Sequence, residues 1–260
     1  MQKLVLIFSF LLSFLFLSQG ATAQEGTVFG EDDRVPVADT TAAPYNAICK
    51  LKITYQNGTT GDGTGFLYGP GLLATAGHCL YDTSYGRGGQ VASVTVYPGL
   101  NAEGAPFGSR ELREDNAGFY LPERWKQDRD WRFDYGVIAF FEPFEEVQPL
   151  QLADWETYPD SALAGTEALI AGYDGAMQSP LLAHGMLSLV REDDLLYRLD
   201  ISHGQSGAPI LDLQSRVIGI QNYGANVGFA AGEMPYNSGA RMNRTLSEFL
   251  LRVENISSPS

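Results

Sequence analysis

Short apolar stretches separated by turn residues recur along most of the chain. In 47–55 (AICKLKITY) apolar side chains at every second position alternate with lysine and threonine, which is the period of a half-buried strand. An Asn-Gly turn follows, as in a β-hairpin. Further apolar stretches of this kind lie at 64–69, 72–80, 91–97, 135–141, 166–173, 185–190, 195–201, 208–213 and 216–223. Many short strands with turns between them predict an all-β barrel or sandwich.

A helical period is found near the C-terminus, over about 243–253. Its apolar positions, Leu246, Phe249, Leu250 and Val253, share one face of a helix. Thr245 and Glu248 have the spacing of a capping box. The proline- and acid-rich stretch 142–161 is the best candidate for a connection between two halves, which we place at 45–146 and 147–260.

The first residues differ from everything that follows. Residues 1–23 combine Lys3, a continuous apolar run and the small residues ATA, which is typical of a secretory signal peptide cleaved after Ala23. A membrane anchor is the alternative, but the run is short for a span of about 20 residues. Residues 24–44 are polar and without periodicity, and we interpret them as an extended segment or a short propeptide.

Composition narrows the partners and the compartment. The formal net charge is −14, which argues against nucleic acid and anionic membrane surfaces as partners. The two cysteines, Cys49 and Cys79, allow at most one disulfide, in keeping with secretion into an extracellular or periplasmic space. We expect a monomer.

One serine has unusual neighbours. Ser206 lies in ISHGQSGAPI (201–210), with Gly204 two residues before it and Gly207 directly after it. Glycine and serine are common in turns, so a simple turn is one interpretation. The other is a nucleophile whose backbone passes close to a substrate, and that interpretation requires a base and an orienting acid elsewhere in the chain.

The chain has three histidines from which a base could come. His78 ends an apolar run in LLATAGHCL, whereas His184 and His203 have no such setting and fit structural or surface roles. Asp134 precedes the strongly apolar strand in RFDYGVIAFF, where it is either a solvated loop residue or a buried acid that holds an imidazole.

Together these stretches form a specific pattern. TAGHC, DYGVI and GQSGAP, in this order and well separated, resemble the catalytic blocks of chymotrypsin-like serine proteases. The phrases DDRVPVADTTAAPY, TGFLYGPGLLATAGHCLYDTS, VYPGLNAEGAPFG and NSGAR are similar to the glutamyl endopeptidase branch of that family. The resemblance extends over roughly 32–250. It implies two six-stranded antiparallel β-barrels, with His78 and Asp134 in the first, Ser206 in the second, and a C-terminal α-helix.

The resemblance also implies the chemistry. Ser206 would attack a peptide carbonyl, His78 would transfer its proton to the leaving amine, and Asp134 would fix the histidine tautomer. The N–H groups of Gly204 and Ser206 would form the oxyanion hole, where we expect a β-carbon at 204 to crowd the substrate oxygen. Protein or peptide substrates are implied. No cofactor is required, and no loop has a recognisable calcium-ligand spacing.

The pattern departs from the family in the specificity pocket. Gln221 stands where glutamyl endopeptidases have a histidine that meets the substrate carboxylate, and Tyr223 follows on the same strand. Asp200 has the offset from Ser206 that places an acid at the pocket base of trypsin-like enzymes, and Ile201 beside it is apolar. The candidate substrate-binding residues therefore leave glutamyl and Arg/Lys preferences both open.

The cysteine pattern departs as well. In the family the cysteine beside the catalytic histidine bonds to a partner on the preceding strand, and Gly63 occupies that place here. The resemblance therefore suggests Cys49, on the adjoining predicted strand, as the substitute partner of Cys79.

Two other function classes compete with a protease. A non-catalytic binding protein on the same scaffold is disfavoured because all three triad residues are present. A secreted β-rich adhesion domain would require the three blocks to have arisen by coincidence.

Overall fold

The computed structural model describes residues 27–158, 163–175, 177–225 and 236–257, so the predicted signal peptide lies outside the described residues. Strands dominate, in the order β1 (Val35–Pro36), β2 (Ile48–Tyr55), β3 (Thr60–Gly69), β4 (Leu72–Thr75), β5 (Tyr81–Asp82), β6 (Gly89–Pro98), β7 (Arg110–Leu112), β8 (Ala117–Tyr120), β9 (Gly136–Phe140), β10 (Glu167–Gly172), β11 (Leu181–Val190), β12 (Asp194–Tyr197), β13 (Pro209–Leu211), β14 (Val217–Tyr223) and β15 (Asn237–Arg241). The helices are α1 (Gly77–Leu80), α2 (Glu123–Asp128) and α4 (Arg244–Ser257), with 3-10 turns at Tyr45–Ala47, Ser84–Gly86, Trp131–Phe133 and Trp155–Thr157.

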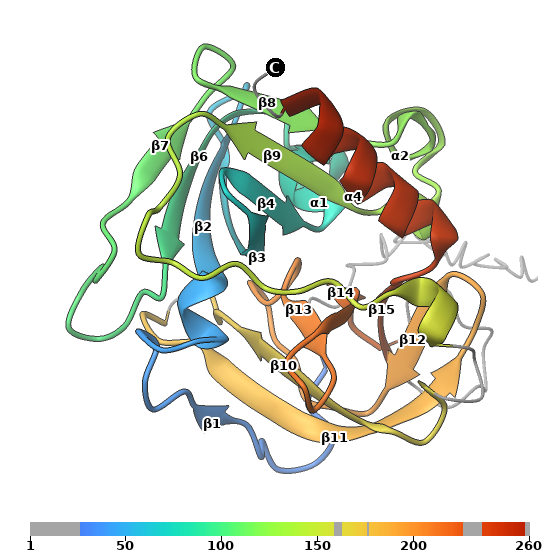
Figure 1. Cartoon of the computed structure of the whole chain (residues 1–260). Coiled ribbons are helices and arrows are strands. Elements are labelled where there is room, and N and C mark those ends of the chain that lie inside the picture. The colour runs from blue at the N-terminus through green and yellow to red at the C-terminus, as the bar shows by residue number, and fades with distance from the viewer. Residues whose placement is uncertain (1–26, 159–162, 176, 226–235, 258–260) are drawn as a thin grey trace, which may run out of the picture.

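The strands of the second half close into a barrel. The order β11-β10-β13-β14-β15-β12 returns to β11 through an added β11–β12 pairing, which makes a ring of six strands. Strand β1 adds to the outside of β11, so the N-terminal segment lies against this second barrel (Figure 1). The predicted all-β architecture is confirmed.

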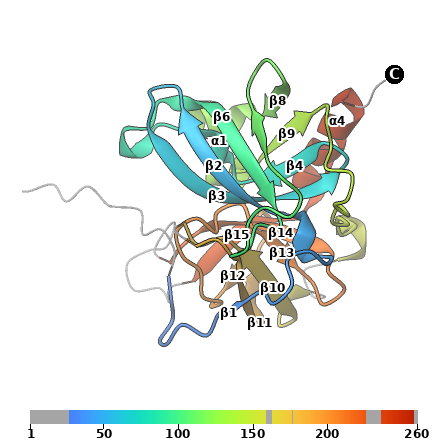
Figure 2. The ribbon, with the colours of Figure 1, turned by 90° about the vertical axis from the view of Figure 1, so that its left-hand side faces the viewer.

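The strands of the first half form an open sheet. The order is β5-β6-β2-β3-β4-β9-β8, with β7 paired to β6 off this path, and the described strands at its two ends do not pair with each other. The first half is therefore a half-barrel beside the closed six-stranded barrel of the second half. Figure 2 shows the two halves stacked face to face.

Helix α4 crosses from the second half to the first. Its apolar face, predicted from sequence, is buried in the core of the first sheet, and the Phe249 ring lies 5.2 Å from that of Tyr135 (Figure 1). The predicted capping box is wrong. Asn243 accepts from the backbone N–H of Leu246 at 3.0 Å instead, because an asparagine before the first turn is itself a good cap, while Glu248 binds Arg244.

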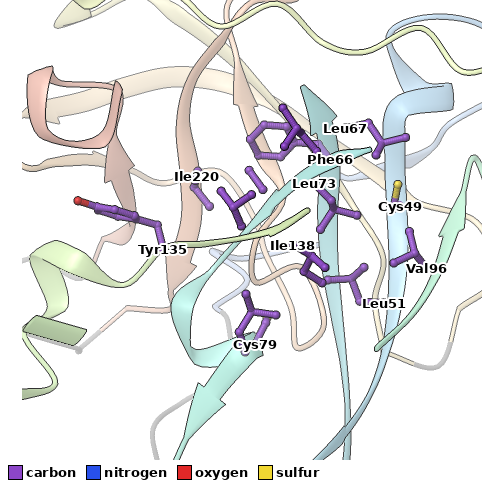
Figure 3. Packing of buried hydrophobic residues seen from close by; sticks show 14 of the residues in the cluster. Cys49, Leu51, Phe66, Leu67, Leu73, Cys79, Val96, Tyr135, Ile138 and Ile220 are labelled. Atoms are coloured by element: carbon purple, nitrogen blue, oxygen red, sulfur yellow. The ribbon is translucent and has the colours of Figure 1, made fainter. Parts of the chain in front are cut away.

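The two cysteines are both buried free thiols, so the predicted disulfide is wrong. Cys49 pairs across the sheet with Gly65, whereas Gly63 is the residue that faces Cys79. The thiols interact instead with separate carbonyl oxygens, Cys49 with that of Ala47 at 3.4 Å and Cys79 with that of Ser206 at 3.7 Å. Figure 3 shows them at separate places in the first core. Burial raises the pKa of Cys79 to about 12, which keeps it an unreactive thiol.

A disulfide can be introduced between position 63 and Cys79. A β-carbon at Gly63 would lie 2.9 Å from the Cys79 sulfur, close enough for one added sulfur atom to bridge them. We expect Gly63→Cys to oxidise spontaneously and to raise the free energy of unfolding by about 3 kcal/mol, the chain-entropy value for a loop of about 15 residues. Thermal unfolding with and without reductant measures this. The double variant Gly63→Cys/Cys79→Ala, which cannot form this disulfide, is the control. An equal rise in its free energy of unfolding would contradict the explanation.

Candidate active site

The pocket that holds two of the predicted catalytic residues, His78 and Ser206, lies where the two halves meet. His78 and Tyr55 reach it from the first half, and Ser206, Asn222 and Tyr223 from the second. The structure therefore brings together side chains that are far apart in the sequence.

His78 and Asp134 form a tight pair at one side of the pocket. The Nδ1 atom of His78 lies 2.8 Å from Oδ2 of Asp134, and the backbone N–H of His78 donates to Oδ1 at 2.7 Å. Asp134 is fully buried at the end of a 3-10 turn that leads into β9, whereas the imidazole retains some exposure. Both carboxylate oxygens of Asp134 thus bind His78, and Nε2 is the imidazole nitrogen that remains available for proton transfer.

Ser206 lies on a turn between β12 and β13. Its hydroxyl donates to the carbonyl oxygen of Asn222 at 3.4 Å, a long bond that a substrate complex would exchange for one to His78. The backbone N–H groups of Gly204 and Ser206 have no acceptor among the described residues. Two amide donors are thus free beside the hydroxyl.

The glycines of this turn are required by the backbone. Gly204 has φ +95°, and a β-carbon there would lie 2.7 Å from the carbonyl oxygen of Tyr173. Gly207 has φ +88°, and its β-carbon would lie 2.1 Å from the carbonyl oxygen of Thr64. Glycine is therefore required at 204 by the backbone conformation and by contacts within the protein itself.

Sequence reasoning missed two residues that support the site. Thr64, on β3, donates from its hydroxyl to the carbonyl oxygen of Gly204 at 2.8 Å and from its backbone N–H to that of Ser206 at 2.9 Å. Asn222, on β14, donates from its amide to the carbonyl oxygen of Asp134. Neither sequence position carries a local signal, because each acts across the boundary between the two halves.

Asp200 does not lie where the trypsin-like interpretation requires. It is buried, and its carboxylate accepts from the backbone N–H groups of Phe29 at 2.7 Å and Asp33 at 3.3 Å. It is not among the residues that line the pocket. The expectation that it forms the base of that pocket is corrected, because the N-terminal segment supplies the donors that satisfy it.

The other predicted pocket residues line the site. Ile201, Gln221 and Tyr223 all face the pocket, and the Tyr223 ring stacks near that of His78 with centroids 6.0 Å apart. The amide oxygen of Gln221 accepts from the hydroxyl of Tyr197. His203 also lines the pocket, whereas His184 is exposed on β11 near Glu167, as expected of residues without catalytic roles.

Comparison with known proteins places this site in a family. The model of the trypsin-like peptidase domain matches residues 63–220, which include all three predicted catalytic residues. The chain belongs to the trypsin-like peptidases. It is therefore a hydrolase of peptide bonds, with proteins or peptides as substrates.

Relatives narrow the branch of this peptidase. A glutamyl endopeptidase of Bacillus licheniformis is 31% identical over 88% of the chain and 69% of its own length. The solved structure of a Glu endopeptidase in complex with MPD has a TM-score of 0.73 at 28% identity, covering 88% of this chain and all of that one. This peptidase lies in the glutamyl endopeptidase branch. The protease Anisep of Arthrobacter nicotinovorans, at 16% identity and a TM-score of 0.62, covering 83% of this chain and 96% of that one, shares the fold.

A further relative has a name that implies a metal. The extracellular metalloprotease of Bacillus subtilis is 29% identical over 73% of the chain, which spans 58% of that relative's length. In the described part of this peptidase, no group of three or more His, Cys, Asp or Glu side chains is placed to hold a metal ion. Nor is any described helix long and apolar enough to cross a membrane.

The environment of His78 predicts how the peptidase responds to pH. Burial of the imidazole opposes protonation, but the charge and hydrogen bond of Asp134 outweigh it and raise the pKa of His78 above its ordinary 6.5. A general base must be unprotonated, so we expect kcat/KM to fall with decreasing pH through a one-proton step centred above pH 6.5. A pH profile with an uncharged peptide substrate measures this. A midpoint below 6.5 would contradict the dominance of Asp134 over burial.

Proposed function

We propose that this chain is a secreted serine endopeptidase that hydrolyses peptide bonds through the triad His78, Asp134 and Ser206. The observation that carries the proposal is the buried Asp134 carboxylate, both of whose oxygens bind His78 beside the serine. An acid held in this way fixes the tautomer with the proton on Nδ1 and stabilises the imidazolium that forms during the reaction.

The proposed reaction proceeds in two halves. Nε2 of His78 takes the proton of Ser206 as its Oγ attacks the substrate carbonyl, and then returns that proton to the leaving amine, which leaves an acyl-enzyme. Water, deprotonated by the same nitrogen, hydrolyses the ester and releases Ser206. Atoms and charges balance without a cofactor.

The free amides of Gly204 and Ser206 are the proposed oxyanion hole. Negative charge moves onto the carbonyl oxygen during attack, and preorganised donors stabilise it more strongly than they stabilise the neutral substrate. Their lack of acceptors among the described residues supports this role, because it leaves both N–H groups available to a substrate oxygen.

Secretion is proposed from residues 1–23 and from the relative named as extracellular. The rival function, a binding protein on the same scaffold, is disfavoured because His78 and Ser206 line one pocket and the buried Asp134 binds His78 from behind it. A binding surface has no need of a buried carboxylate that orients an imidazole.

For specificity we propose cleavage after glutamate. The bond from Tyr197 occupies the amide oxygen of Gln221, so the group that Gln221 offers the pocket is its NH₂ donor, which suits a carboxylate or carboxamide oxygen. Asp200 does not oppose such a substrate, because its carboxylate is turned to the backbone of the N-terminal segment. The named activity of the glutamyl relatives supports the same preference.

Matched peptides with Glu, Arg or Phe before the scissile bond test this proposal. We expect wild type to cleave the Glu peptide fastest. Gln221→Leu should lower kcat/KM for the Glu peptide by roughly 10-fold or more, in the range of a lost hydrogen bond to a charged group, while changing the Phe peptide little.

Asp200→Ser provides the matched control, since it tests the trypsin-like alternative. Because Asp200 lies outside the pocket lining, this substitution should change cleavage of all three peptides by a similar factor. Fastest cleavage of the Arg peptide, lost selectively in Asp200→Ser, would overturn the proposed preference and establish the alternative.

A further inference from the structure

Arg34 is the single Lys or Arg residue in the sequence of the N-terminal segment 24–44, and the proposed catalytic steps do not use it. Its side chain is 4% exposed. Its Nε and Nη2 atoms form a two-point pair with the carboxylate of Asp32, at 2.9 Å and 2.7 Å. The remaining nitrogen, Nη1, points the other way, into the second barrel.

Nη1 of Arg34 binds the turn that carries the nucleophile. It donates to the hydroxyl of Ser202 at 2.6 Å and to the amide oxygen of Gln205 at 2.7 Å. Gln205 is fully buried, and the same oxygen accepts from the backbone N–H of Ser202 at 2.9 Å. One guanidinium nitrogen therefore ties both ends of the turn 202–205 together.

This turn sets the direction of the two free amides. Gly204 lies inside it, and Ser206 directly follows Gln205. We propose that Arg34 is a positioning residue of the peptidase, which holds the turn 202–205 so that the N–H groups of Gly204 and Ser206 converge on the substrate oxygen. The inference rests on the proposed function, because it assigns a task within the same oxyanion hole.

Charge makes this contact hard to replace. Asp174 accepts from the hydroxyl of Ser202 at 2.8 Å, and Asp32 and Asp200 also lie near the guanidinium. Without Arg34, the carboxylates of Asp32, Asp174 and Asp200 would lose the one guanidinium that interacts with all three. Their mutual repulsion, and the loss of one of the two bonds to the Gln205 oxygen, which would keep only that from the Ser202 N–H, would favour other conformations of the turn.

The segment that carries Arg34 is hydrogen-bonded to the second barrel at two further points. Asp200 binds the N–H groups of Phe29 and Asp33. The carbonyl oxygen of Thr27 accepts from the N–H of Ile201 at 3.2 Å and from the amide of Asn237 at 2.9 Å. These contacts fix the backbone from which Arg34 reaches inward, and they give the buried Asp200 a role other than reading the substrate.

The test compares Arg34→Ala with wild type and with Arg113→Ala. Arg113 is the matched control, because it also pairs with an acid two residues earlier, Glu111, but is exposed and far from the pocket. We expect kcat of Arg34→Ala to fall about 100-fold, the effect of losing one oxyanion donor, with KM little changed. The pH midpoint assigned to His78 should stay in place, since Arg34 does not touch that pair.

Added guanidinium at millimolar concentration separates positioning from a general loss of structure. It should raise kcat of Arg34→Ala in a saturable way and leave wild type unchanged. Arg34→Lys should remain impaired, because an ammonium cannot bind Asp32 at two points and also reach Gln205. If Arg34→Ala does not fold, Arg34→Lys decides by the same kcat measurement.

The outcomes separate this inference from the function on which it rests. A kcat within about threefold of wild type overturns the inference, and so does a loss of activity that follows the melting temperature and is not rescued by guanidinium. If the wild-type protein cleaves no peptide and a fluorophosphonate does not label its Ser206, the proposed function is overturned instead.

Discussion

Replacing Ser206 by alanine should abolish peptidase activity while leaving the fold intact. The hydroxyl contributes a single 3.4 Å bond to Asn222, so its removal costs the folded protein little. In the proposed reaction, however, its oxygen forms the acyl-enzyme, and loss of a triad nucleophile lowers kcat by on the order of 10⁶. Steady-state kinetics on a Glu peptide, together with thermal unfolding, measure both effects.

Ser109→Ala is the control for this substitution, because Ser109 is exposed on the first half and far from the pocket. It should have wild-type activity and an unchanged melting temperature. Activity of purified Ser206→Ala close to that of wild type would mean that another residue attacks the substrate.

Replacing Asp134 by asparagine should have the second largest effect. The amide keeps the size of the carboxylate, but its NH₂ group donates where His78 also donates, so the imidazole must turn or take the wrong tautomer. It also removes the buried negative charge that stabilises the imidazolium. We expect kcat to fall by about 10⁴ at neutral pH.

Asp128→Asn is the matched control, since Asp128 is an exposed carboxylate in α2 whose partner is Arg124. Its kinetics should equal those of wild type. Wild-type kinetics in Asp134→Asn would contradict the orienting role. The pH midpoint of any residual activity in this variant should lie lower than that of wild type, because the charge that raises the pKa of His78 is gone.

The periodicity of apolar residues in the sequence is enough to predict strands and a helix with one buried face. The alternation in 47–55 corresponds to β2, and the apolar face of 243–253 is the buried face of α4. The short strands β7 and β8 were not predicted, because three or four residues give too few positions to define a period. Strand β15 has small and polar residues, and its pairing comes from its neighbours β12 and β14.

The three catalytic blocks could be recognised because each needs a local sequence. The sequence does not show which way a side chain points when its hydrogen-bond partners lie far away along the chain. Asp200 has the right offset from Ser206 for a pocket acid, but the N–H groups that capture it belong to residues about 170 positions earlier. The cysteine pairing failed for the same kind of reason, since it depends on which residue of β2 or β3 faces α1.

Covalent labelling with a fluorophosphonate tests the central claim most directly. Such a probe reacts only with a serine whose proton is taken by a positioned base, and it leaves a phosphonyl group on that oxygen. Peptide mass spectrometry of labelled wild type should locate a single modification on Ser206, and His78→Ala should not be labelled. Wild type that stays unmodified, or that carries the label on another serine, would contradict the triad.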